Sequence, residues 1–325
     1  MIPAGEDPTR ELRVLLQQGQ YREILDRFMP LPDGAVDESP ATGLFIATAA
    51  TRVGSLGVGE TIATRTLDAF RNRADDDGCM RCHNLLGAIS HERGSMDAAA
   101  SHFGRALELS RARSDLQTGA RASGNLASLA FLGGRLEEAA SLLREADLAY
   151  QRLGDRRGLA ETYHNLSIIY RNQGDVSGSV RASEQAVRHA DEVDEAGLTS
   201  LTTAGLAEAL VADGSYSNVP ELLDRAARLA MAADDPAGVA EADRIRATLS
   251  LALGDYATAL ALADQAVAEA LRLDSAQLQA ESAIVAVRAL RGLHRHNEAA
   301  ALRGEAEAIF ERLGATYQLG LLRDR

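Results

Sequence analysis

The sequence predicts an all-α protein, an α-solenoid built from about eight helix pairs that pack mainly on their neighbours. Three observations support this prediction. The chain has a forty-residue internal repeat, each repeat has apolar residues at helical spacing, and turn or cap residues stand where the helices should start and stop. Because the repeat runs through most of the chain, it outweighs the two domains that a length of 325 residues would otherwise suggest.

Two series of small residues define the forty-residue repeat. One places glycine at the same point of successive repeats, and the other places alanine twelve residues later. The glycines are Gly94, Gly134, Gly174, Gly214 and Gly254, with His294 at the next step, and the alanines are Ala106, Ala146, Ala186, Ala226, Ala266 and Ala306. Because glycine readily adopts the left-handed backbone that ends a helix, the first series marks a turn inside each repeat.

The segments on either side of each turn have helical patterns. The stretches "TGARASGNLASLAFLGG" and "GLAETYHNLSIIYRNQG" carry apolar residues at spacings of three and four, and "RLEEAASLLREADLAYQRL" predicts a second helix. Asp115, Asp155 and Asp235 stand where the first helix of a repeat should begin. A carboxylate at that point accepts hydrogen bonds from the unpaired amides of the first turn. Each repeat is therefore predicted to be a helix, a turn and a helix.

One repeat resembles the tetratricopeptide repeat (TPR) family in its small and aromatic positions: Asn165-Leu166, Tyr170, Gly174-Asp175 and Ser179. Two further repeats, around Asn125-Leu126 and Gly254-Asp255-Tyr256, match the same pattern. The resemblance implies a right-handed α-solenoid. The repeat of forty residues exceeds the usual 34, so it is similar to the long-helix TPRs of kinesin light chains and bacterial regulators.

The predicted organisation is a single TPR solenoid over residues 1–325. Residues 77–313 hold six regular forty-residue repeats, residues 1–76 hold two divergent N-terminal helix pairs, and residues 314–325 form a C-terminal tail. The Pro-rich stretch "MPLPDGAVDESP" separates the two divergent pairs.

Composition excludes several classes of function. A net charge of −13 and a pI near 5.1 argue against a nucleic-acid partner, which needs a basic face. The chain has no lysine, so all 34 basic residues are arginine, which excludes chemistry that depends on a lysine amine. No apolar run is long enough for a membrane span and no signal peptide is evident, so we expect a cytoplasmic protein without a membrane partner.

The segment Cys79-Met80-Arg81-Cys82-His83 has the C-x-x-C-H spacing of a covalent haem attachment site. On a helix these positions share a face, so the thiols and the imidazole could hold a porphyrin or a metal ion. In the repeat register, however, His83 stands where the resemblance implies packing between paired helices. We favour a structural role for Cys79, Cys82 and His83 and expect no cofactor; a haem- or metal-binding redox protein is the alternative.

The resemblance also implies that the first helix of each repeat lines a concave groove that binds partners. The residues expected in this partner-binding groove are Arg81, Asn84, Arg121, Asn125, Phe131, His164, Asn165 and Arg171. Later repeats are expected to place seven further residues on the same wall: Glu208, Glu241, Arg244, Thr248, Glu281, Arg288 and Arg291.

Two features of this wall bear on the partner. Asn125 and Asn165 share one register, and such an asparagine either bonds the backbone of an extended peptide or merely fits a polar helix face. Arg81, Arg121 and Arg171 suit a segment with acidic residues. We expect a non-enzymatic scaffold, adaptor or regulator that binds a protein or peptide, whereas the partner's identity and the oligomeric state are left open. A sensory part of a larger regulator is a third possibility.

Overall fold

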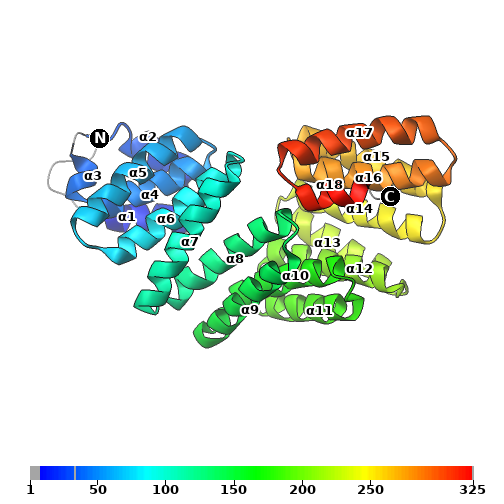
Figure 1. Ribbon diagram of the computed structural model, residues 1–325, viewed down its shortest axis with the longest axis horizontal. Helices are drawn as coiled ribbons and strands as arrows, with labels where there is room; N and C mark the ends of the chain where they lie inside the picture. The colour runs from blue at the N-terminus through cyan, green and yellow to red at the C-terminus, as the bar shows by residue number, and fades with distance from the viewer. Residues whose placement is uncertain (1–7, 33, 324–325) are drawn as a thin grey trace. The chain divides into compact units, whose positions relative to one another are not determined.

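The structure is a computed structural model that describes residues 8–32 and 34–323, and the regular elements in these ranges are eighteen helices with no strand (Figure 1). Residues 1–7 of the predicted N-terminal helix pairs and residues 324–325 of the predicted tail lie outside the described residues. Within the described ranges no helix is long and apolar enough to cross a membrane. The prediction of an all-α solenoid of helix pairs is confirmed.

The chain divides into two compact units, residues 1–126 and 127–325. Unit 1 holds α1 (Thr9–Gln17), α2 (Tyr21–Phe28), α3 (Ala35–Glu38), α4 (Pro40–Arg52), α5 (Leu56–Asn72), α6 (Asp76–Glu92), α7 (Met96–Arg113) and the start of α8 (Leu116–Leu132). The prediction that all the repeats form one continuous solenoid stays a prediction.

Unit 2 continues from the second half of α8. It holds α9 (Leu136–Leu153), α10 (Arg156–Asn172), α11 (Val176–Val193), α12 (Ala196–Asp213), α13 (Val219–Ala232), α14 (Pro236–Ala252), α15 (Tyr256–Arg272), α16 (Ala276–Gly292), α17 (His296–Arg312) and α18 (Thr316–Arg323). Consecutive first helices also contact one another, in the order α10, α12, α14 and α16. These four helices form the first-helix layer of unit 2.

The forty-residue register sets where the first helices begin. The helices α6, α8, α10, α12, α14 and α16 start at residues 76, 116, 156, 196, 236 and 276, each forty residues after the last. The predicted caps are confirmed, since the carboxylates of Asp115, Asp155 and Asp235 accept from the amides of Thr118, Gly158 and Gly238 at 3.0, 2.9 and 3.0 Å. Each cap satisfies an amide that the helix itself leaves unpaired.

Small residues permit close crossings of neighbouring helices, both within the pairs and between them. All six alanines of the second series are buried, with at most 1% of each side chain exposed. Gly158 on α10 is equally constrained, because a Cβ added there would lie 2.5 Å from the ring of Tyr150 on α9. A larger side chain at these points would force the helices apart.

The segment predicted as a tail, residues 314–325, contains the helix α18. Its first residue, Thr316, follows the start of α16 by forty residues, so α18 takes the register of a further first helix. Leu319 and Leu322 of α18 are buried in a cluster with Ile309 and Phe310 of α17. The sequence "GATYQLGLLR" is too short to show the apolar periodicity that identifies the other helices, so the sequence did not predict α18.

Candidate partner-binding site

In unit 1 the predicted groove residues come from α6 and α8. Arg81 and Arg121 stand forty residues apart and are exposed, whereas Asn84 and Asn125 are half-buried. The side-chain amide of Asn125 donates to the Asn84 side-chain carbonyl at 3.1 Å. Because an asparagine side chain has two donors and an acceptor with two lone pairs, this bond leaves both residues capacity for a ligand's backbone.

In unit 2 the predicted groove residues on α10, His164, Asn165 and Arg171, are half-buried, and His164 and Arg171 already make contacts with α12. Arg171 forms an ion pair with Glu208 of α12 at 2.8 Å. The ring of His164 packs on Gly205 of α12, where an added Cβ would lie 2.7 Å from Nδ1. Burial lowers the pKa of His164 to about 4, so this ring is neutral at pH 7. The basic character expected from Arg171 and His164 is thus largely absent from this part of the wall.

A chain of ion pairs runs through the first-helix layer of unit 2. At its centre is the guanidinium of Arg244 on α14, whose side chain is only 8% exposed. It contacts Glu208 of α12 at 2.8 Å, Glu241 of α14 at 2.6 Å and Glu281 of α16 at 3.9 Å. With the Arg171–Glu208 pair, the chain joins all four helices of the layer. We call these five residues the ion-pair ladder.

Burial and charge act in opposite directions on the ladder's carboxylates. Burial by itself raises the pKa of Glu208, but the adjacent Arg171 and Arg244 outweigh it and bring that pKa to about 2. Burial also raises the pKa of Glu281, and there Arg244, at 3.9 Å, compensates only in part. The carboxylate of Glu208 is therefore held firmly in its charged form, whereas that of Glu281, at the α16 end of the ladder, is protonated more readily.

The repeat register placed the ladder residues on one wall but did not predict that they pair. The available signal is their alternating charge on neighbouring first helices: Arg171, Glu208, Arg244 and Glu281 come from four successive repeats. Neighbouring first helices pack side by side, so opposite charges at offset positions meet across them.

The predicted groove residue Phe131 is partly covered by another side chain. The centre of its ring lies 5.9 Å from the centre of the ring of Tyr317 on α18.

The C-x-x-C-H residues lie in the core of unit 1. Cys82 is fully buried and Cys79 is 6% exposed, in a cluster with Leu67, Phe70 and Leu86. Burial raises the pKa of both thiols, that of Cys82 to about 12, which keeps them protonated at neutral pH.

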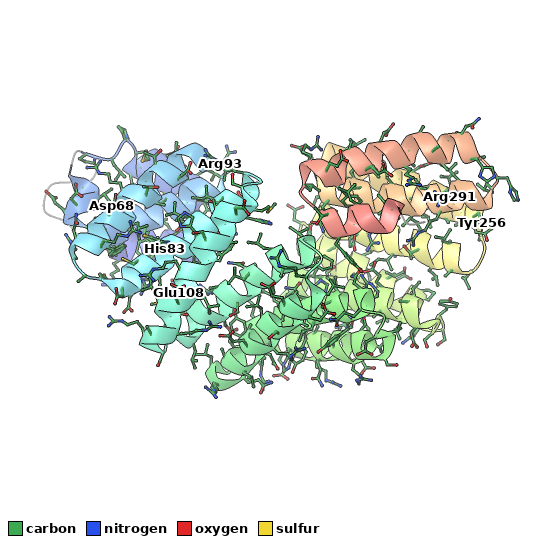
Figure 2. All side chains as sticks on the ribbon, in the orientation of Figure 1. Asp68, His83, Arg93, Glu108, Tyr256 and Arg291 are labelled. Atoms are coloured by element: carbon green, nitrogen blue, oxygen red, sulfur yellow. The ribbon has the colours of Figure 1, made fainter. Side chains whose placement is uncertain are left out.

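His83 makes a polar contact with a histidine of the next helix. It lies on α6 (Figure 2), and its Nδ1 is 3.1 Å from Nδ1 of His102 on α7, a distance at which one ring donates and the other accepts. Among the residues that the structure describes, no group of three or more His, Cys, Asp or Glu side chains is placed to hold a metal ion. Buried, protonated thiols do not fit the haem or metal alternative, because a porphyrin edge would reach Cys82 only if the core of unit 1 opened.

No family model matches the sequence, and no curated protein matches it. Solved structures do. The Rap protein complexed with Competence and Sporulation Factor has a TM-score of 0.72 at 15% identity, over 95% of this chain and 88% of that one. The Rap conjugation gene regulator of plasmid pLS20 in complex with the Phr* peptide has a TM-score of 0.66 at 14% identity, over 94% and 91%.

The quorum sensor NprR from B. thuringiensis, in its apo form, has a TM-score of 0.64 at 14% identity and covers 93% of this chain and 86% of that chain. This chain has the fold of the TPR-type repeat proteins. At these identities the likeness establishes the fold. The TPR fold explains why the first helices pack side by side and present their polar residues in rows.

Proposed function

We propose that this chain is a non-enzymatic regulatory adaptor of the cytoplasm that binds a peptide or protein segment along the first helices. The observation that carries the proposal is the set of polar, incompletely buried side chains on α6 and α8, in which Arg81 and Arg121 share one register and Asn84 bonds to Asn125. The solved TPR relatives support it, since two of them are complexes, one with Competence and Sporulation Factor and one with the Phr* peptide.

The side chains of unit 1 favour an acidic segment in an extended conformation. Arg81 and Arg121 are exposed, and stacked helices bring equivalent residues about 10 Å apart, a spacing that an extended peptide spans in three residues. The Asn84–Asn125 pair beside them suits the peptide backbone, because an amide both donates and accepts. In unit 2, by contrast, an acidic ligand would compete with Glu208 for Arg171. We therefore assign the acid-preferring part of the site to unit 1.

An array of synthetic ten-residue peptides of graded charge, probed with the full chain, tests this function. We expect acidic peptides to bind, and Arg81→Ala with Arg121→Ala to weaken binding at least tenfold, because a charge-assisted hydrogen bond is lost at each position. A second variant, Asn165→Ala with Arg171→Ala, examines the wall of unit 2 separately.

The matched control is Arg144→Ala with Arg188→Ala, two exposed arginines on the second helices α9 and α11. These changes remove the same charge without altering a first helix, so peptide affinity should stay within about twofold of wild type. Wild-type affinity in both first-helix variants, together with a loss in the control, would place the partner on the opposite face and refute the proposal.

A further inference from the structure

Helix α18 makes a polar contact with residues far away in the sequence of unit 2. The Thr316 hydroxyl donates to the carbonyl of Leu132 at 3.2 Å, and the Tyr317 hydroxyl donates to the carbonyl of Asn172 at 3.1 Å. The rings of Tyr317 and Phe131 lie 5.9 Å apart at 51°. Figure 1 shows the start of α18 beside the end of α8. These contacts join residues 145 and 184 positions apart.

Both acceptors are the last residues of first helices, Leu132 of α8 and Asn172 of α10, and they stand forty residues apart. The last carbonyls of a helix have no partner inside it and carry the negative end of its dipole. In the turn after α8, the amides of Gly134 and Arg135 bond to Phe131 and Ala130 instead. The two hydroxyls of α18 therefore act as C-terminal caps for two helices of other repeats.

The polar contact at the start of α18 is only partly shielded from solvent, whereas Leu319 and Leu322 further along the helix pack against α17. Thr316 is exposed and Tyr317 only half-buried. Next to the two bonded residues, Oε1 of Gln318 on α18 and Nη1 of Arg171 on α10 are both buried without a hydrogen-bond partner. A buried polar atom without a partner destabilises the arrangement that buries it. An eight-residue helix at the end of the repeat array, with its polar contact partly exposed, is expected to open by local unfolding before the central helices of unit 2.

We propose that α18 is a releasable latch. When it opens, the ring of Phe131 and the carbonyls of Leu132 and Asn172 form a docking site for a helical segment that carries the same hydroxyl and aromatic pair as Thr316 and Tyr317. In the docked state the latch covers Phe131, which the sequence placed on the partner-binding wall. The latch goes beyond the proposed peptide binding, and its test uses the chain's own segment, so either proposal can fail without the other.

A disulfide can lock the latch. A Cβ added at Gly134 would lie 3.8 Å from Cβ of Tyr317, which is the average separation in disulfides. Gly134 has a φ of 74°, but the same register holds His294 with a φ of 59°, so a side chain is tolerated at this turn. Gly134→Cys with Tyr317→Cys gives one protein that is locked when oxidised and weakened when reduced, and the native Cys79 and Cys82 are buried in unit 1.

The probe is a fluorescein-labelled synthetic peptide with the sequence of residues 313–323, "LGATYQLGLLR". By fluorescence anisotropy, we expect it to bind the reduced double-cysteine chain at least tenfold more tightly than the oxidised chain. Thr316→Ala with Tyr317→Ala should also bind it more tightly than wild type. The same peptide carrying Tyr317→Ala is the control and should bind at least tenfold more weakly, because it lacks the ring and the hydroxyl.

Two results would overturn the latch. One is equal affinity, or no binding, in the oxidised and reduced chains. The other comes from hydrogen exchange of the wild-type chain: the amides of α18 should exchange at least tenfold faster than those of α14 and α16, and equal rates would make α18 a permanent part of the core. Far-UV circular dichroism checks that each variant is folded. The oxidised and reduced states belong to the same double-cysteine protein, so their comparison does not depend on the folding of any other variant.

Discussion

The first helices of unit 1 and unit 2 occupy the same repeat register but carry different polar chemistry. In unit 1, α6 and α8 hold a neutral amide pair, Asn84 and Asn125, flanked by the exposed Arg81. In unit 2 the equivalent helices hold the ion-pair ladder centred on the buried Arg244. The difference shows that the shared repeat fold leaves the polar chemistry of its first helices free, so one unit can expose its arginines while the other uses its charges to hold its own helices together.

The largest expected effect comes from breaking the ladder at its centre. Arg244→Ala leaves the partly buried Glu241 and Glu281 without their cation and leaves Glu208 with Arg171 alone, so the free energy of unfolding should fall by about 2–5 kcal/mol. Urea denaturation followed by circular dichroism measures the loss. The matched change in unit 1, Arg81→Ala, removes an exposed charge and should shift stability by less than about 0.5 kcal/mol. Similar small effects from both changes would show that the ladder does not stabilise unit 2.

Acid should destabilise both units, most strongly through the imidazoles of His83 in unit 1 and His164 in unit 2. The pKa of His83 and that of His164 are lowered to about 4, mainly by burial. In the unfolded chain a histidine binds a proton near pH 6.5, whereas these two rings stay neutral in the folded chain until pH nears 4. The folded state therefore keeps its full stability above pH 6.5 and loses free energy of unfolding as pH falls toward 4, on the order of 2–3 kcal/mol for each ring.

Urea denaturation at pH 7, 5.5 and 4.5 measures this loss, and His83→Gln and His164→Gln should each make it smaller. Proton NMR titration of the two rings gives their pKa values directly. Values near 6.5 for either ring would contradict the expected burial effect in that unit.

Adding a methyl group at a helix crossing should affect the two units equally, because both use the same crossing. A Cβ at Gly78 would lie 2.2 Å from the ring of Phe70 in unit 1, and one at Gly158 would lie 2.5 Å from that of Tyr150 in unit 2. Each glycine-to-alanine change should cost about 1–3 kcal/mol in thermal or urea denaturation. The control is Gly104→Ala, because a Cβ added there has nothing within 4 Å. This change should raise the free energy of unfolding by up to about 1 kcal/mol, since alanine favours a helix more than glycine does. A stabilising Gly78→Ala or Gly158→Ala would show that the rings move aside.

The smallest expected effect belongs to the amide pair of unit 1. Asn125→Ala removes one neutral, half-buried hydrogen bond to Asn84 and should lower the free energy of unfolding by about 0.5–1.5 kcal/mol. A double-mutant cycle with Asn84→Ala should give a coupling near 1 kcal/mol or less. A coupling of several kcal/mol would mean that the amide pair stabilises unit 1 as strongly as the ladder stabilises unit 2.

The fold was predictable because its determinants repeat along the sequence. Glycine at the turns, alanine at the crossings and aspartate at the caps recur every forty residues, and each acts on its local backbone. The contacts that the repeat did not predict all lie between repeats. Arg171 meets Glu208 across two first helices, and Tyr317 meets Asn172 after a separation of 145 residues. Such contacts depend on the curvature of the stack, which no single repeat specifies. His83 was predicted to pack within its pair, and it does.

The ion-pair ladder also has a consequence for how unit 2 unfolds. In a repeat protein, stability is a sum of weak intrinsic terms and nearest-neighbour coupling terms, and arrays with weak coupling lose their repeats one at a time from the ends. The ladder ties α10, α12, α14 and α16 into one electrostatic chain, and loss of the repeat that carries Arg244 would take the cation away from both Glu208 and Glu281. We therefore expect the central repeats of unit 2 to unfold together rather than one at a time.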